Sequence, residues 1–179
     1  FSAQTAQAMM ACGEKFAYID ALTELPNRRM FEQNYARNIH RVKRHDHQLA
    51  LFFIDLDRFK PVNDKYGHKV GDALLVAVAN CLKKTIRDED FLSRLGGDEF
   101  LVMLYPLDNV QNLKILGHRI VEACRKPFVV EGLELHVSVS VGIAYNKESM
   151  VDPKVLLKKA DTAMYKAKKK GADGVEIAE

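Results

Sequence analysis

An uninterrupted run of apolar residues that ends in a carboxylate limits most strongly how this chain can fold. Residues 49–54 read Leu-Ala-Leu-Phe-Phe-Ile and are followed directly by Asp55. Strands that are covered on both faces carry continuous apolar runs of this length, whereas strands with one solvated face alternate. We therefore expect this segment to be the central strand of a sheet that is packed on both sides.

Helices are expected on either side of this strand in the sequence. Apolar residues recur at helical spacing in four segments. These predicted helices cover residues 29–45, 72–86, 110–126 and 153–170.

The other strands follow from turn signals and from period-two alternation. Gly96-Gly97 is typical of a tight hairpin between two short strands, and Glu131-Gly132 predicts a second turn. Leu135 to Ala144 alternates apolar residues with small or polar ones, which predicts one buried face. The predicted strands are residues 91–95, 99–105, 128–130, 135–144 and 174–177. This order predicts an α/β fold of the α+β plait type, ferredoxin-like or nucleotidyl-cyclase-like, with an antiparallel-centred sheet flanked by helices.

Length and composition fit one globular domain after a helical segment. We expect residues 1–19 to form a lead-in helix or linker and residues 20–179 to form the domain. The net charge of +3 is too small to favour nucleic-acid or membrane binding in bulk. The chain starts without Met, which suggests a piece of a longer protein.

The cysteines and the absence of long apolar stretches bear on location. Cys12, Cys81 and Cys124 are odd in number and widely spaced, so we expect buried or inactive thiols in a reducing, cytoplasmic compartment. No run approaches the ~20 apolar residues of a membrane span. A membrane tether elsewhere in a longer protein stays open.

Acidic residues cluster at two predicted strand ends. Asp55 and Asp57 end the central strand, and Asp98 and Glu99 follow the paired glycines. In a plait the hairpin lies beside the central strand, so Asp98 would approach Asp55 and the two could share Mg²⁺ with substrate phosphates. A solvated strand end and an ordinary acidic turn are the simpler alternatives for each cluster taken alone.

The segment from Phe59 to Asp72 is unusually polar for a connection between two core elements. Its Asn and Asp side chains offer acceptors that suit the N1–H and amino donors of guanine. The alternatives are turn formation by Asn63-Asp64 and helix capping by Asp72.

Taken together in order, these residues resemble the GGDEF family of diguanylate cyclases, from Asp20 to about Ile177. The matching strings are Asp20-x-Leu22-Thr23-x-Leu25-Pro26-Asn27-Arg28, Asp55-x-Asp57-x-Phe59-Lys60-x-x-Asn63-Asp64-x-x-Gly67-His68-x-x-Gly71-Asp72, Arg94-x-Gly96-Gly97-Asp98-Glu99-Phe100, Ser140-x-Gly142-Ile143-Ala144 and Ala160-Asp161-x-Ala163-x-Tyr165-x-Ala167-Lys168. The resemblance implies the condensation of two GTP molecules into cyclic di-GMP, a bacterial second messenger, with release of two pyrophosphates.

The resemblance also implies a role for each matched position. Mg²⁺, with Mn²⁺ as an alternative ion, would be held by Asp55, the Leu56 carbonyl and Asp98, and Glu99 would assist in activating the 3′-hydroxyl or in metal coordination. The implied GTP contacts are Asn63 and Asp72 to guanine, Lys60 and Lys168 to phosphates, the backbone near Arg58 and Phe59, and the room left by Gly96 and Gly97.

Regulation and assembly are implied in the same way. Each monomer of the family holds one GTP, so two domains must face each other as a homodimer, and flanking sensor or effector domains are expected. Arg87-x-x-Asp90 stands in register with the family's product-inhibition site, with Arg119 as a further contributor. A charged loop is the alternative for this segment. Where the family usually has a basic residue four positions after Lys168, this chain has Ala172, which predicts weaker GTP binding.

One other function remains open, and a further one is disfavoured. The domain could be a catalytically weak or inactive module that binds GTP or cyclic di-GMP and regulates a larger signalling protein. An RNA-binding plait is disfavoured, because the strands lack exposed stacking aromatics and basic residues.

Overall fold

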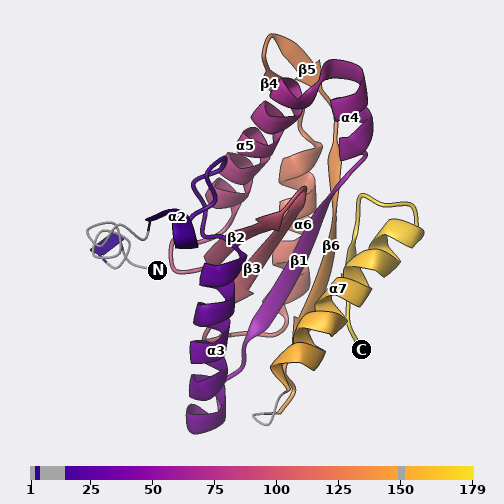
Figure 1. Cartoon of the computed structure of the whole chain (residues 1–179). Helices are drawn as coiled ribbons and strands as arrows, with labels where there is room; N and C mark the ends of the chain where they lie inside the picture. The colour runs from indigo at the N-terminus through magenta and orange to yellow at the C-terminus, as the bar shows by residue number, and fades with distance from the viewer. Residues whose placement is uncertain (1–2, 5–14, 149–151) are drawn as a thin grey trace.

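The computed structural model describes residues 3–4, 15–148 and 152–179. Its main sheet has five strands in the order β2-β3-β1-β6-β7, and a separate two-stranded sheet pairs β4 with β5 (Figure 1). The strands are β1 (Ala50–Asp57), β2 (Phe91–Gly96), β3 (Glu99–Leu104), β4 (Phe128–Val130), β5 (Leu133–Leu135), β6 (Ser138–Tyr145) and β7 (Val175–Ile177). The helices are α2 (Lys15–Tyr18), α3 (Arg28–His45), α4 (Phe59–Tyr66), α5 (His68–Thr85), α6 (Asn112–Arg125) and α7 (Pro153–Lys169). The predicted α/β fold is confirmed.

Strand β1 is the centre of the sheet, as its apolar run predicts. It pairs antiparallel with β3 on one side and with β6 on the other. Its alternate side chains enter two separate cores. Phe52 and Ile54 belong to the core with α5 and α6, whereas Leu51 and Phe53 belong to the core with α3 and α7. Burial on both faces is the physical reason why the run is continuous rather than alternating.

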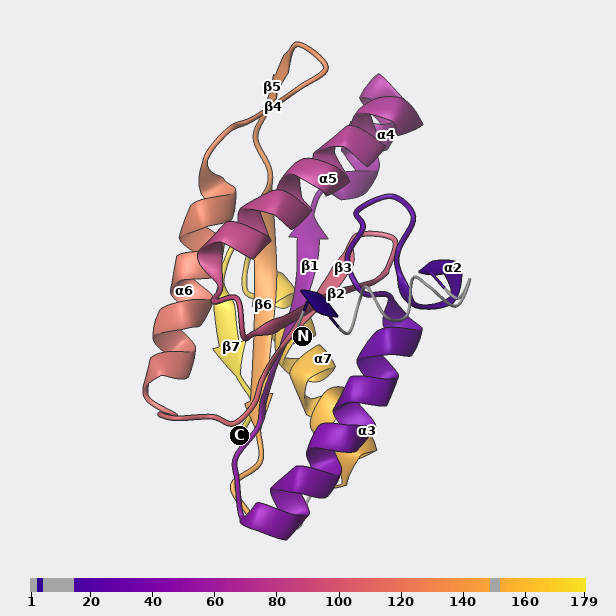
Figure 2. The ribbon, with the colours of Figure 1, turned by 90° about the vertical axis from the view of Figure 1, so that its left-hand side faces the viewer.

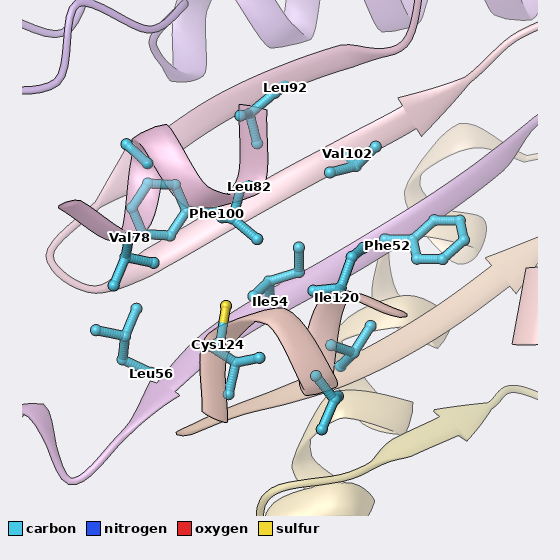
Figure 3. Packing of buried hydrophobic residues seen from close by; sticks show 14 of the residues in the cluster. Phe52, Ile54, Leu56, Val78, Leu82, Leu92, Phe100, Val102, Ile120 and Cys124 are labelled. Atoms are coloured by element: carbon cyan, nitrogen blue, oxygen red, sulfur yellow. The ribbon is translucent and has the colours of Figure 1, made fainter. Parts of the chain in front are cut away.

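Figure 2 shows this layering with α5 and α6 on one face of the sheet and α7 on the other. In the first core, Figure 3 shows side chains of β1 beside those of α5 and α6. The residues drawn there include Phe52, Ile54, Leu56, Val78, Leu82, Ile120 and Cys124. Each fully buried large apolar side chain of this kind contributes roughly 1.5–3 kcal/mol to folding.

The expected strand over residues 135–144 is wrong in two respects. It is divided, because Leu133–Leu135 pairs with β4 across the Glu131-Gly132 turn while β6 starts only at Ser138. In addition, β6 is buried on both faces, since α7 packs on its small residues. A Cβ added to Gly142 would lie 2.1 Å from the backbone nitrogen of Met164. The alternation therefore reflects a close helix contact and not a solvated face.

The polar segment before α5 also differs from expectation. Residues 59–66 form the helix α4, which places Asn63 and Asp64 inside a helix rather than in a turn. Helix α5 begins at His68 with Gly67 as its N-cap, so Asp72 lies within the helix and does not cap it. Pro61 is compatible with α4 because a proline in the first turn removes no internal helix hydrogen bond.

The expected lead-in helix over residues 1–19 lies largely outside the described residues. Within this range, the structure describes the short helix α2, Lys15–Tyr18. Among the helices that the structure describes, none is long and apolar enough to cross a membrane.

Candidate active site

The end of β1 and the β2–β3 hairpin together form the candidate site. Asp55 pairs with Glu99 across the two strands, and the Leu56 backbone N–H donates to the Asp98 carbonyl at 3.2 Å. The structure thus brings Asp98 beside Asp55, as the sequence predicts. Gly96 and Gly97 have φ values of 138° and 50°, and both face open space, so glycine is required for the turn and leaves the turn accessible.

The electrostatics of this site favour a bound cation. Only 15% of the Asp55 side chain is exposed, and its buried Oδ1 has no hydrogen-bond partner. Burial, followed by the neighbouring charge of Asp98, raises the pKa of Asp55 to about 7, although Lys168 opposes the rise. Burial also raises the pKa of Glu99, with Asp161 and Asp98 adding to the effect. Clustered carboxylates whose charged forms are disfavoured are candidates for a functional site.

The oxygen atoms at this site are suitable ligands for Mg²⁺ that arrives with a nucleotide. Asp55, Asp98 and the Leu56 carbonyl offer hard oxygen atoms, and the unpartnered Oδ1 of Asp55 is free to bind. Across the part of the chain that the structure describes, no three His, Cys, Asp or Glu side chains converge as a complete metal site. Mg²⁺ commonly takes one or two carboxylates and completes its shell with phosphates and water.

Lys168 lies at this carboxylate cluster rather than out in solvent. Its Nζ donates to the Leu56 carbonyl at 3.0 Å and to Asp57 Oδ1 at 3.2 Å, and it lies 3.6 Å from Asp55 Oδ2. The residue comes from the last turn of α7. Its ammonium group therefore offsets the negative charge of the site, while the phosphate contact stays a prediction.

Asp57 has a role that the sequence did not indicate. Its side chain is 4% exposed and accepts hydrogen bonds from Ser138, Ser140 and the backbone N–H of Asp173. Burial on its own would raise the pKa of Asp57, but these bonds and Lys168 lower it overall. Asp57 thus joins β1, β6, α7 and the turn after α7, and it positions Lys168 rather than facing a substrate.

Arg94 is a second organising residue missed at the sequence level. Its guanidinium donates to the Gly97 carbonyl at 2.8 and 3.0 Å and to both carboxylate oxygens of Asp20 at 3.0 and 3.1 Å. Burial opposes ionisation of Asp20, but hydrogen bonds from Thr23 and Arg94 lower its pKa overall. The hairpin turn is thereby fixed to the segment that precedes α3. The matched strings containing Asp20 and Arg94 were the available signal, but they do not reveal this contact.

Besides Lys168, Gly96 and Gly97, the residues expected to contact GTP lie on α4, on α5 and at the junction of β1 with α4. Asn63 has a buried Oδ1 without a partner, and a Cβ at Gly71 would lie 1.7 Å from that atom. Asp72, the next residue, is exposed. Arg58 has φ 62° and precedes the first turn of α4, where Phe59 and Lys60, but not Pro61, carry backbone N–H groups that could bind an anion. Phe59 is half-buried and Lys60 is exposed in that turn.

The expected inhibitory residues lie away from this cluster. Arg87 and Asp90 form a turn at the start of β2, where the Arg87 N–H donates to Asp90 Oδ2 at 3.0 Å. The Gly96-Gly97 turn is at the other end of the same strand, about 17–20 Å away at the rise of a β-strand. Arg119 is exposed on α6. Any ligand of Arg87 and Asp90 therefore occupies a second site.

Fold and site together define a nucleotidyl-cyclase-like domain with a carboxylate pair at the end of its central strand. Comparison with known proteins then gives the family. Residues 17–174 match the family model described as diguanylate cyclase, GGDEF domain. The chain belongs to this family.

Two curated relatives show the same similarity. The chain is 39% identical to diguanylate cyclase TpbB of Pseudomonas aeruginosa over 164 residues, which are 91% of this chain and 38% of that protein. It is also 39% identical to signaling protein YkoW of Bacillus subtilis over 157 residues, which are 87% of this chain and 20% of that protein. The chain thus spans well under half the length of these relatives.

Solved structures agree with the fold. A structure comprising only the GGDEF domain of TpbB has a TM-score of 0.85 at 38% identity and covers 90% of this chain and 95% of its own. The GGDEF domain of DgcB from Caulobacter crescentus, solved in complex with c-di-GMP, has a TM-score of 0.85 at 27% identity and covers 91% and 94%.

Proposed function

We propose that this domain is a diguanylate cyclase that condenses two GTP molecules into cyclic di-GMP and releases two pyrophosphates. The observation that carries the proposal is the approach of Asp98 to Asp55, whose buried Oδ1 has no partner, beside an open Gly96-Gly97 turn. This is the arrangement that a nucleoside triphosphate with its divalent cation requires.

GTP would be held from three sides. Asn63 and Asp72 offer acceptors to guanine, and the space left by Gly71 allows Asn63 its position. The N-terminal turn of α4, with Lys60, offers donors to the phosphates. When bound, Mg²⁺ would neutralise phosphate charge and polarise the reacting phosphoryl group, with Mn²⁺ as an alternative.

The bond changes require two copies of the domain. Each 3′-hydroxyl loses its proton and attacks the α-phosphate of the GTP in the other domain, and the bond to pyrophosphate breaks. Glu99 would accept that proton or support the metal, and its raised pKa makes it a better proton acceptor than an ordinary glutamate. Catalysis would then depend on alignment and charge neutralisation within a homodimer.

The regulatory proposals rest on the second site. Arg87 and Asp90, with Arg119, would bind the product cyclic di-GMP and inhibit the enzyme, because arginine can pair with guanine O6 and N7. We further propose that residues 20–179 are the catalytic domain, that residues 1–19 are a lead-in segment, that this domain is cytoplasmic, and that the longer protein carries flanking sensor or effector domains.

A second function, a weak or inactive nucleotide-binding module, is favoured by two observations. Ala172 stands where a basic residue is usual, and Lys168 is engaged by Leu56, Asp57 and Asp55 rather than free for phosphate. Calorimetry with GTP and with cyclic di-GMP, beside a turnover assay after removal of bound product, separates the two functions. Binding with turnover supports the cyclase, and binding without turnover supports the regulatory module.

A further inference from the structure

Lys168 contacts the same groups that the candidate site offers to a divalent cation. Its Nζ donates to the Leu56 carbonyl at 3.0 Å and lies 3.6 Å from Asp55 Oδ2. An ammonium group and a metal ion cannot share these oxygen atoms at low cost, because two cations a few ångströms apart repel strongly in a partly buried place. Lys168 therefore has to leave the Leu56 carbonyl before Leu56 and Asp55 can together bind a cation.

The network around Lys168 allows the side chain to leave. Lys168 donates to Asp57 Oδ1 at 3.2 Å, which is the longest of the four hydrogen bonds that this carboxylate accepts from described residues. The other three donors, at 2.7, 2.7 and 2.9 Å, are Ser138 Oγ, Ser140 Oγ and the Asp173 N–H. The buried carboxylate of Asp57 thus keeps three partners when Lys168 moves, and no charge is stranded without a hydrogen bond.

The Lys168 side chain is itself suited to exchange one anion for another. It is 28% exposed, whereas the side chain of Asp57 is 4% exposed. Lysine carries its charge at the end of a flexible four-carbon stem, and its three donors can turn to a new acceptor. The phosphates of a bound nucleotide would supply that acceptor.

We propose that Lys168 is an exchangeable counter-ion, which covers the cation-binding oxygen atoms until a nucleoside triphosphate arrives and then passes to its phosphates. The exchange makes the site select the complex of cation and nucleotide and reject a free divalent cation. This inference rests on the proposed cyclase function, because it gives Lys168 an earlier partner at the same site. It also reconciles the contacts of Lys168 in the structure with its expected role at phosphate.

The first measurement is the binding of Mn²⁺ without nucleotide, followed by electron paramagnetic resonance. Lys168→Met removes the charge and keeps a side chain of similar length, so the affinity for Mn²⁺ should rise about tenfold or more. Addition of Asp98→Ala to this variant should abolish the gain, which places the bound ion at the carboxylate pair. Lys166→Met is the matched control, because Lys166 is exposed on the same helix, and its affinity should equal that of the wild type.

The second measurement is the binding of the α,β-methylene analogue of GTP with Mn²⁺, by calorimetry. This analogue cannot release pyrophosphate, so binding is observed without turnover. Lys168→Met should weaken the binding of the analogue about tenfold, because a charge-assisted bond to phosphate is lost, and Lys166→Met should not. Opposite changes in the two affinities are the signature of the exchange, since a merely structural role of Lys168 would not tighten the binding of free Mn²⁺.

Equal affinities for free Mn²⁺ in the wild type and in Lys168→Met would overturn the proposal. Lys168→Gln is a second neutral variant, and circular dichroism shows which of the two folds. The wild type gives an independent result: it should bind free Mn²⁺ as weakly as Asp98→Ala does, and much tighter binding by the wild type would also overturn the proposal. Failure of the cyclase function would be seen separately, as a lack of cyclic di-GMP in the turnover assay.

Discussion

Replacement of Asp57 by Asn tests the network that fixes the end of β1 to α7. Oδ2 of Asp57 accepts from Ser138 Oγ at 2.7 Å and from the Asp173 N–H at 2.9 Å. Oδ1 accepts from Ser140 Oγ at 2.7 Å and from Lys168 Nζ at 3.2 Å. The hydroxyls can rotate to accept, but the Asp173 N–H and the Lys168 ammonium can only donate.

The magnitude follows from this donor pattern. Whichever way the new amide is turned, its NH₂ group faces a donor-only group, so one charge-assisted bond is lost in a buried place. Such losses cost about 2–4 kcal/mol, and for a chain of this size the melting temperature should fall by about 5–15 °C.

Thermal and urea unfolding followed by circular dichroism measure the effect of Asp57→Asn. Asp108→Asn is the matched control, because Asp108 is exposed and its replacement removes the same charge. The control should change the free energy of unfolding by less than about 0.5 kcal/mol. If Asp57→Asn behaved like Asp108→Asn, the network would not stabilise the fold and this reasoning would be refuted.

Three further predictions address packing, nucleotide binding and pH. Gly142→Ala should destabilise the fold by about 3 kcal/mol in urea unfolding, because its Cβ would meet the α7 backbone, whereas Gly174→Ala, with no atom nearer than 3.6 Å, should be nearly neutral. Ala172→Arg should lower the Michaelis constant for GTP, and an unchanged constant would show that this position makes no phosphate contact. Because the folded pKa of Asp20 is lowered from 3.8, its contribution with Arg94 is present above that pH and is lost as the pH falls through the folded value. The difference in unfolding free energy between wild type and Asp20→Asn should therefore shrink in acid titrations, and a constant difference down to the lowest pH would contradict this account.

The elements that the sequence predicted best are those whose burial pattern is simple. The apolar run before Asp55 identified β1 because both of its faces are covered, and Gly96-Gly97 identified the hairpin because the turn needs positive φ. Helix α4 was missed because it has only eight residues and none of them is fully buried, so its few apolar residues are too short a pattern to mark a helix. In the sequence of β6, Gly142 stands where an alternating strand would have a solvent-facing residue. In the structure the position is small because the backbone of α7 lies against it.

The candidate site was predicted in part. The approach of Asp98 to Asp55 followed from hairpin topology alone, which the sequence pattern could supply. The contacts of Asp57 and Arg94 join segments far apart in the chain, and such pairings depend on tertiary structure that one sequence does not contain. The engagement of Lys168 by the carboxylates was missed for the same reason.

The central claim is that the Asp55–Asp98 pair supports cyclic di-GMP synthesis, and one turnover assay tests it most directly. The chain, freed of bound product, is incubated with GTP and Mg²⁺ beside an Asp98→Ala variant whose folding is checked by circular dichroism. We predict cyclic di-GMP and two pyrophosphates per product from the wild type, and at least a hundredfold less from the variant, roughly the effect of removing one charge-stabilising group. Equal turnover by the folded variant, or no product from the wild type at protein concentrations that permit dimers, would contradict the claim.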